Sequence, residues 1–306
     1  GQSVLQDMNE IIKLYEFYDG TGQKWVTPDT LNYEPTKLRT NITKKLINKE
    51  ASFMFDRVPK IDLNAVNKDD VEKVQKIQQH INKVLKENNF SKKLQNGAKD
   101  CFVGKRIALK LWASKQEGIK IMFKPSLEFI FGIESDDSDK LTKIIFFYQK
   151  NNEIDKNKQI IWKQKFELIN GKCILNEGIY NGYGNLLEII EENKDTGLDF
   201  IPAYVILNEG LTGDLLGESD IPEDLIENQN KYNRMKSDDI DSLRFSMFPR
   251  TVYKNCGKKT FKNLIAKPGA IIDAQPENAS GKDPDVKNLE SNFSYNDRFE
   301  NSIKRL

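Results

Sequence analysis

Residues that could support nucleophilic, acid–base or zinc chemistry are few and scattered in this 306-residue chain. A Ser-His-Asp or Cys-His site needs a histidine beside its nucleophile. The single histidine, His80, lies on a predicted helix outside the apolar stripe, and no nucleophile is identifiable near it. Three distant cysteines, Cys101, Cys173 and Cys256, lack the spacing of a zinc site. We expect them to be reduced and to act as small buried hydrophobic residues.

Two groups of aspartates could bind a divalent metal only if their carboxylates converged in space. The groups are Asp136, Asp137, Asp139 and Asp238, Asp239, Asp241. The first lies at a predicted hairpin tip, and the second is spread around a predicted helix because each residue turns by about 100°. No glycine-rich segment extends to a phosphate-binding loop. We therefore expect no enzyme, no metal and no cofactor, and keep a metal-dependent nuclease as the least favoured alternative.

The overall charge balance also restricts the partners of the chain. Lys and Arg number 47 and Asp and Glu number 46, so no basic excess favours a protein that simply coats nucleic acid. No signal peptide is visible, and no apolar run is long enough to span a bilayer, so we expect no membrane partner. With 38% hydrophobic residues, the chain can build the core of one large or two ordinary domains.

Hydrophobic periodicity predicts an α+β fold. Apolar residues at helical spacing predict helices over 3–18, 36–55 and 69–90. From about residue 102 to 190, short runs rich in β-branched and aromatic residues alternate with turn-forming segments. This pattern is typical of an antiparallel β-meander joined by hairpins.

A further long helix is predicted over residues 223–247, after an acidic turn. On a helical wheel, one half carries Leu225, Ile226, Tyr232, Met235, Ile240, Leu243 and Met247, and the other Glu227, Lys231, Arg234, Asp238 and Asp241. We expect the apolar half to pack inward and the charged half to face outward. Phe245 and Phe248 lie off the apolar stripe and indicate a second contact surface, as at a subunit interface.

Charge is unevenly distributed around this helix. Residues 195–230 contain no Lys or Arg, whereas residues 250–267 contain no acidic residue. The basic segment carries Arg250, Lys254, Lys258, Lys259, Lys262 and Lys267. The sequence leaves open whether these are two solvated surfaces or the sites of charged partners.

Several segments resemble the portal proteins of tailed bacteriophages, of the kind found in long-tailed phages of Gram-positive hosts. The resemblance rests first on DFIPAYVILNEG (199–210) and LLGESDIPEDLIENQNKYNRMKSDDIDSLRF (215–245). It extends to LYEFYDG (14–20), LRTNITKKLINKEASFMF (38–55), LIAKPGAII (264–272) and SYNDRFENSIKRL (294–306).

The resemblance implies a portal-like α+β architecture. Residues 1–222 would form the wing, 223–247 the first stem helix, 248–285 a small α/β clip, and 286–306 the start of a second stem helix. Portal proteins usually continue beyond this point, so the resemblance implies that a C-terminal remainder is absent.

The resemblance also implies a function. Portal subunits form a ring, a dodecamer, at one vertex of the capsid in the virion, after assembly in the host cytoplasm. The ring passes double-stranded DNA during packaging and ejection without sequence specificity. It binds the terminase large subunit, a head–tail adaptor and the major capsid or scaffold protein, and is not an enzyme. A non-viral α+β protein-interaction scaffold is the main alternative.

The resemblance assigns roles to specific residues. Lys231, Arg234, Asp238 and Asp241 would face the channel, where mixed charge would hold DNA only weakly. The basic clip residues Arg250, Lys254, Lys258, Lys259 and Lys262 would contact the motor or DNA. Phe245 and Phe248 would lie at the subunit interface.

Overall fold

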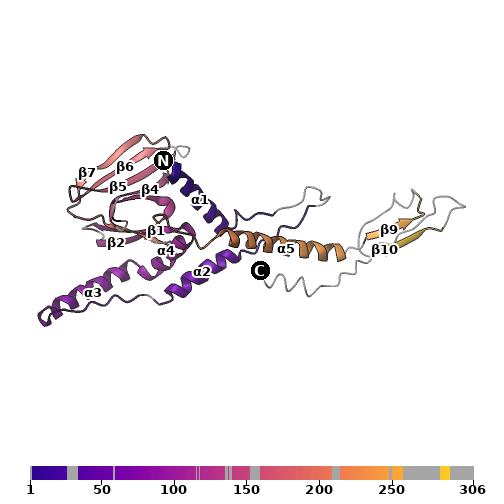
Figure 1. The fold of residues 1–306 in the computed structure, drawn as a ribbon, viewed down its shortest axis with the longest axis horizontal. Helices are drawn as coiled ribbons and strands as arrows, with labels where there is room; N and C mark the ends of the chain where they lie inside the picture. The colour runs from indigo at the N-terminus through magenta and orange to yellow at the C-terminus, as the bar shows by residue number, and fades with distance from the viewer. Residues whose placement is uncertain are drawn as a thin grey trace. The chain divides into compact units, whose positions relative to one another are not determined.

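A computed structural model describes two compact units in the chain, one formed by residues 1–23 and 41–226 and the other by 24–40 and 227–306. Figure 1 shows the chain as a ribbon. The described residues are 2–25, 34–57, 59–114, 116, 118–134, 137, 140–151, 159–208, 214–247, 250–257 and 283–289. None of the helices in these ranges is long and apolar enough to cross a membrane.

Three helices of the first unit share one hydrophobic core: α1 (Gln2–Asp19), α2 (Ile42–Phe55) and α4 (Phe90–Gly104). Their apolar side chains recur at helical spacing and therefore face one another. The buried members are Leu14, Phe17, Ile47, Ala51, Ala98, Phe102, Val103 and Ile221.

The helix predicted over 36–55 begins later, at Ile42, because Asn41 accepts a hydrogen bond from the Lys44 backbone N–H at 2.9 Å and caps it. Residues 36–41 are not helical. The prediction was therefore wrong for its first turns. The apolar residue Leu38, which suggested helix there, lies in a segment of the second unit.

The helix predicted over 69–90 is α3 (Val71–Glu87), followed by a break at Asn88 and Asn89. Asn89 adopts a left-handed conformation with φ of 49°, which an α-helix cannot continue through. The Asn88 side chain donates to Val84 O at 2.9 Å and accepts from the Ile121 N–H at 2.8 Å. The sequence analysis did not predict α4, which follows this break.

The predicted single meander over 102–190 is instead divided between two antiparallel sheets. The first has the order β2-β1-β8, and the second is a five-stranded meander in the order β3-β4-β5-β6-β7. The first contains β1 (Arg106–Ser114), β2 (Gly118–Pro125) and β8 (Ala203–Leu207). The second contains β3 (Phe129–Ile133), β4 (Leu141–Asn151), β5 (Gln159–Ile169), β6 (Lys172–Asn181) and β7 (Leu186–Asp195).

The short 3-10 helix η2 (Ser126–Glu128) separates the two sheets in the chain, so β3 does not continue the pairing of β2. Strand β8 lies beyond the predicted meander and pairs with β1, as Ala108 opposite Val205 shows. The meander prediction was therefore correct for antiparallel strands but wrong in joining them into one sheet. A local pattern cannot anticipate a distant strand that completes a sheet.

A second hydrophobic core joins residues of both sheets, including Ala108 of β1 and Phe146 of β4. Within it lies Lys110, whose side-chain ammonium donates a hydrogen bond to Gln164 Oε1. The ammonium nitrogen lies 4.7 Å from the ring centre of Phe146 and 5.2 Å from that of Trp162. The aromatic faces attract the cation and partly replace its lost hydration. Cys101 and Cys173 are buried, as predicted, while Cys256 is half-buried.

The second unit contains most of α5 (Glu223–Met247), which spans the range predicted for a helix. It also contains β9 (Arg250–Lys254) and β10 (Asp285–Leu289), which pair antiparallel with Lys254 opposite Asp285. Residues 286–289 are therefore extended and not helical, contrary to the boundary placed at 286. The remainder of the predicted second stem helix, 290–306, lies outside the described residues.

Candidate functional site

The most buried face of α5 is polar. It consists of Gln229, Asn233, Ser237 and Asp241, which we call the polar face. Residues four apart lie on one side of an α-helix, so these side chains form a row along it. The predicted inward half is less buried, and Ile240 within it is 38% exposed. The helical-wheel prediction therefore missed the most buried row of described side chains, although Ile226 of the predicted inward half does pack against a hydrophobic core.

The polar face binds the backbone of an extended segment, residues 34–40, which we call the strap. Three alternate backbone N–H groups of the strap donate to three side chains of the polar face. Thr36 donates to Asp241 Oδ2 at 2.9 Å, Leu38 to Ser237 Oγ at 3.0 Å, and Thr40 to Asn233 Oδ1 at 3.0 Å.

The repeat distance of the extended strap and that of the α-helix match closely enough for successive hydrogen bonds to form a ladder between them. Two residues of extended chain advance about 6.6 Å, and four residues of α-helix advance about 6.0 Å. The strap runs antiparallel to the helix, and Gln229 Nε2 closes the ladder by donating to Thr40 O at 2.8 Å. At the other end, the Thr36 hydroxyl donates to Asp241 Oδ1 at 2.6 Å.

The hydrogen-bond ladder contradicts the prediction that Asp241 lies on the outward, charged half of α5. Asp241 is 3% exposed, and both of its carboxylate oxygens accept hydrogen bonds from Thr36. It therefore does not belong to the outward charged face. It is also unavailable as the third carboxylate of a metal site with Asp238 and Asp239. Across the described residues, no three His, Cys, Asp or Glu side chains gather in a way that could hold a metal ion.

The other three predicted residues do lie on an exposed face. Lys231 pairs with Glu227 at 3.3 Å, and Arg234 pairs with Asp238 at 3.7 Å. Both pairs are four residues apart on the helix and largely exposed, so each contributes little to stability. Their main consequence is electrostatic, since each positive side chain of this face has a negative neighbour.

The basic segment after α5 is described only at its start. Arg250 begins β9, where its backbone pairs with Leu289, and Lys254 is exposed at the end of that strand. The side chain of Phe245 and residues Phe248, Lys258, Lys259 and Lys262 lie outside the described residues. Their predicted roles therefore stay predictions.

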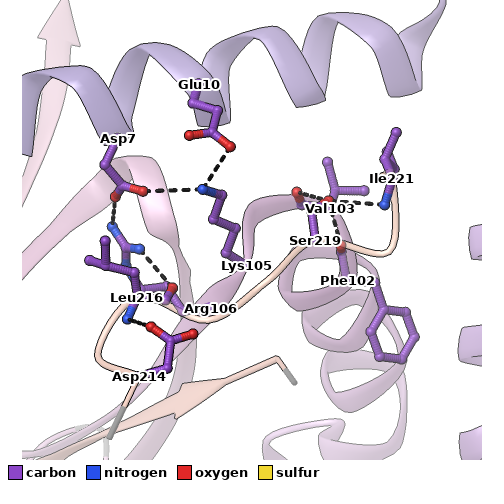
Figure 2. Close-up of polar contacts among 10 residues, drawn as sticks. All are labelled: Asp7, Glu10, Phe102, Val103, Lys105, Arg106, Asp214, Leu216, Ser219 and Ile221. Carbon is purple, nitrogen blue, oxygen red and sulfur yellow. Dashed lines mark hydrogen bonds and ion pairs between the residues drawn. The ribbon is translucent and has the colours of Figure 1, made fainter. Parts of the chain in front are cut away.

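The start of α5 follows a turn that is bound to the C-terminal end of α4, as Figure 2 shows. The Ser219 hydroxyl lies 3.1 Å from Phe102 O and 2.9 Å from Val103 O, and the Asp220 N–H donates to Phe102 O at 2.9 Å. The last carbonyls of a helix have no partner inside it, so this turn satisfies them. The Ile221 N–H in turn donates to Ser219 Oγ at 3.2 Å.

Gly217 allows the turn to approach this closely. Its φ is 71°, and a Cβ atom there would lie 2.3 Å from Lys105 O. Any other residue would be strained in this conformation and would collide with the backbone. The glycine that begins the run GESDI (217–221) is thus required by the close approach to Lys105, the residue that follows α4.

A buried ion cluster holds the same turn on its other side (Figure 2). Asp7 of α1 accepts hydrogen bonds from Arg106 and from Lys105, the latter at 3.4 Å. Lys105 also pairs with Glu10 at 2.9 Å, and Arg106 donates to Leu216 O at 3.0 Å. The cluster joins α1, the start of β1 and the turn.

The sequence analysis missed both the polar face and the ion cluster. The polar face has a signal in the sequence, because Gln229, Asn233, Ser237 and Asp241 recur every four residues with short hydrogen-bonding side chains. The alternating Thr36, Leu38 and Thr40 carry the complementary period of two. The cluster has no such signal, since Asp7 and Arg106 are 99 residues apart.

These features define a class of protein: an α+β protein with a long helix whose buried side chains bind backbone and whose exposed side chains are paired charges. Residues 3–306 match the family model described as Phage portal protein, SPP1 Gp6-like. The chain therefore belongs to this phage portal family, which confirms the resemblance drawn from its motifs. No match to an individual curated protein was found.

Proposed function

We propose that the chain is one subunit of a ring at the capsid vertex, with a channel that carries double-stranded DNA during packaging and ejection. Within that ring, α5 forms part of the channel wall. The observation that carries this proposal is the division of α5 into two faces. The polar face is occupied by the strap, which leaves Lys231, Arg234 and Asp238 exposed on the charged face.

The paired charges suit a channel through which DNA must move. Affinity for DNA rises steeply with the number of phosphates that a protein neutralises. Here Glu227 and Asp238 lie beside Lys231 and Arg234 and compete with phosphates for them. Such a face attracts DNA weakly and leaves it free to slide.

Further parts of the proposal follow from the portal family. The subunits would form a dodecamer in the virion after assembly in the host cytoplasm. The ring would bind the terminase large subunit, a head–tail adaptor and the major capsid or scaffold protein. The basic residues Arg250 and Lys254 would contribute to a motor or DNA contact. The chain itself would be structural, without a catalytic role or a cofactor.

The first experiment tests the ring. The purified chain should form rings with a central hole in negative-stain images and a matching single species in sedimentation velocity. A monomer or small oligomer at all concentrations would contradict the proposal and favour the protein-interaction scaffold.

The second experiment tests the charged face. Asp238→Lys should unpair Arg234 and add a positive charge, so binding of a short DNA duplex should tighten and depend more steeply on salt. Asp224→Lys, in the first turn of α5, is the matched control because Asp224 is also exposed. An equal effect of the two substitutions would show that the charged face has no special access to DNA.

A further inference from the structure

The turn between β6 and β7, residues 181–185, presents a tyrosine to solvent, and we call it the hairpin tip. The Tyr183 side chain is 94% exposed. A tyrosine that finds a partner buries a large ring, and the residues that anchor protein interfaces are enriched in tyrosine. A ring held this far from its own subunit indicates a contact with another molecule.

The backbone of the hairpin tip is fixed by its own hydrogen bonds. Asn181 Oδ1 accepts from the N–H groups of Tyr183 at 3.0 Å and Asn185 at 2.9 Å. The Gly184 N–H donates to Asn181 O at 3.0 Å, and Gly184 has a φ of 86°, which glycine adopts without strain. Because these bonds exist before any contact forms, docking of Tyr183 costs little conformational entropy.

The C-terminal end of α2 forms a hollow that can receive an aromatic ring. Its volume is about 440 Å³, within the range of about 300–1,000 Å³ that is usual for binding pockets. Lys49, Phe53 and Asp56 follow one another at four- and three-residue spacing, so they lie on one side of the helix end. We call this site the α2 hollow; its lining residues are Lys49, Ser52, Phe53, Met54, Asp56 and Arg57.

The α2 hollow offers a partner to each part of a tyrosine side chain. Phe53 and Met54 are 90% and 57% exposed and can pack against a ring. The positive side chains of Lys49 and Arg57 can lie over the face of that ring. The Asp56 carboxylate can accept the hydrogen bond of the phenol hydroxyl. A purely aliphatic side chain would leave these charged groups unused.

The charges that line the α2 hollow sum to one positive charge. Lys49, Asp56 and Arg57 are exposed, and none of them forms an ion pair within the described ranges. All three line the same hollow, so their charges act together on a group that enters it. The α2 hollow therefore attracts a negatively charged partner.

The β6–β7 hairpin carries the opposite charge. Residues 173–193 contain no Lys or Arg and four acidic residues. The acidic residues are Glu177, Glu188, Glu191 and Glu192. Lys172 and Lys194, at the base of the hairpin, are both already paired with acidic side chains. The net charge of the hairpin attracts a positive hollow at long range, whichever side of the sheet each carboxylate occupies.

One subunit does not bring its own hairpin tip and α2 hollow together. Both belong to the first unit, and Figure 1 shows β6 and β7 apart from α2 within it. The ring and the hollow of a single chain therefore both stay open to a neighbouring molecule.

We propose that the hairpin tip of one subunit inserts Tyr183 into the α2 hollow of a second copy of this chain. Such a contact uses two different patches, so each subunit binds one neighbour on each side, and the series closes into a ring if the rotation permits. The proposal rests on the ring of the proposed function and assigns residues to its subunit contact.

Removal of either aromatic ring gives the first test. Tyr183→Ser and Phe53→Ser should each weaken the contact at least tenfold, because each removes an anchor of the interface. Tyr183→Phe keeps the ring and should retain most of the contact. Val66→Ser is the matched control, since Val66 is 97% exposed and belongs to neither site. The readout is the fraction of rings in sedimentation velocity as a function of protein concentration.

A double-mutant cycle shows whether the two rings meet. If Tyr183 packs on Phe53 of the neighbour, the double variant Tyr183→Ser with Phe53→Ser should weaken the contact little more than either single substitution. Effects that multiply would show that the two residues act at separate places and would overturn the proposal. Circular dichroism and thermal melts show whether each variant is folded.

The outcomes separate this contact from the ring itself. If the unmodified chain forms rings and Tyr183→Ser forms them equally well, the docking contact is overturned while the proposed function stands. If the unmodified chain forms no rings, the proposed function fails, and disulfide trapping decides whether two copies still make the contact.

Disulfide trapping measures the contact directly. Tyr183→Cys and Met54→Cys replace two exposed residues, one at each site. A chain with both cysteines should give a ladder of covalent oligomers under mild oxidation, because each subunit then links to two neighbours. Either cysteine alone should give nothing larger than dimers. Absence of a ladder from the double variant would overturn the contact, whether or not rings form.

Discussion

Asp241 accepts two hydrogen bonds from Thr36, one from the backbone N–H at 2.9 Å and one from the hydroxyl at 2.6 Å. The two residues are 205 positions apart in the chain. Their contact is the end of the ladder by which α5 holds the strap. It explains why an aspartate that looks like part of a charged outer face is buried.

Replacing Asp241 should release the end of the strap. Asp241→Ala removes both hydrogen bonds and leaves the Thr36 N–H without its acceptor, at a cost of about 2–3 kcal/mol. Hydrogen exchange should show faster exchange of the Thr36 amide. Asp238→Ala is the control, since Asp238 is exposed and should leave that amide unchanged. Unchanged protection in Asp241→Ala would mean that the ladder does not hold the strap.

Removing Asp7 should destabilise the first unit much more than removing an exposed acid. Asp7→Ala leaves Arg106 buried without its anionic partner, which costs about 3–5 kcal/mol. Asp19→Ala breaks the exposed pair with Lys44 and should cost about 0–1 kcal/mol. Urea unfolding followed by circular dichroism measures both. Equal costs would show that the cluster does not stabilise the unit.

The Ser219 hydroxyl should protect the C-terminal end of α4. Ser219→Ala removes the hydroxyl from the carbonyls of Phe102 and Val103 and should cost about 1 kcal/mol. The midpoint of urea unfolding should fall, with faster amide exchange in the last turn of α4. Glu218→Ala, at the exposed neighbouring side chain, should change neither. A Ser219→Ala protein as stable as the unmodified chain would contradict this role.

Lys110 should make stability depend on alkaline pH. Burial lowers the pKa of Lys110 to about 8 from its ordinary value of 10.5, and nearby Lys124 acts in the same direction. Between these values the unfolded chain binds more protons than the folded one, so the free energy of unfolding should rise with pH. The full penalty of the buried charge is present below about pH 8.

Lys110→Met should reduce this dependence. Urea unfolding at several pH values between 7 and 11 should show that the difference in stability between Lys110→Met and the unmodified chain shifts by on the order of 3 kcal/mol. Comparing the two proteins at each pH cancels the other titrating groups. Parallel curves over the whole range would show that Lys110 retains an ordinary pKa in the fold.

The local sequence was sufficient for those features that depend on neighbouring residues. The range of α5, the amphipathic stripe of α3 and the antiparallel pairing of the strands all follow from short periodic patterns. The motifs around Ser219 and Asn233 also carried the resemblance to the portal family that the family match confirms. Gly217 lies in the motif around Ser219. The reason for a glycine at this position, the close approach to Lys105 O, is visible only in the tertiary structure.

The tertiary structure decided which faces are buried and which strands share a sheet. A helical wheel assumes that apolar side chains face inward, yet α5 buries its row of Gln, Asn, Ser and Asp. It does so because the strap is an extended chain whose N–H groups need acceptors once they are covered. The strap and the polar face of α5 lie about two hundred positions apart in the sequence, and the paired strands β1 and β8 lie about a hundred positions apart. No local sequence pattern spans either separation. The sequence alone therefore determined where helices and strands form, whereas tertiary contacts determined which of their faces are buried.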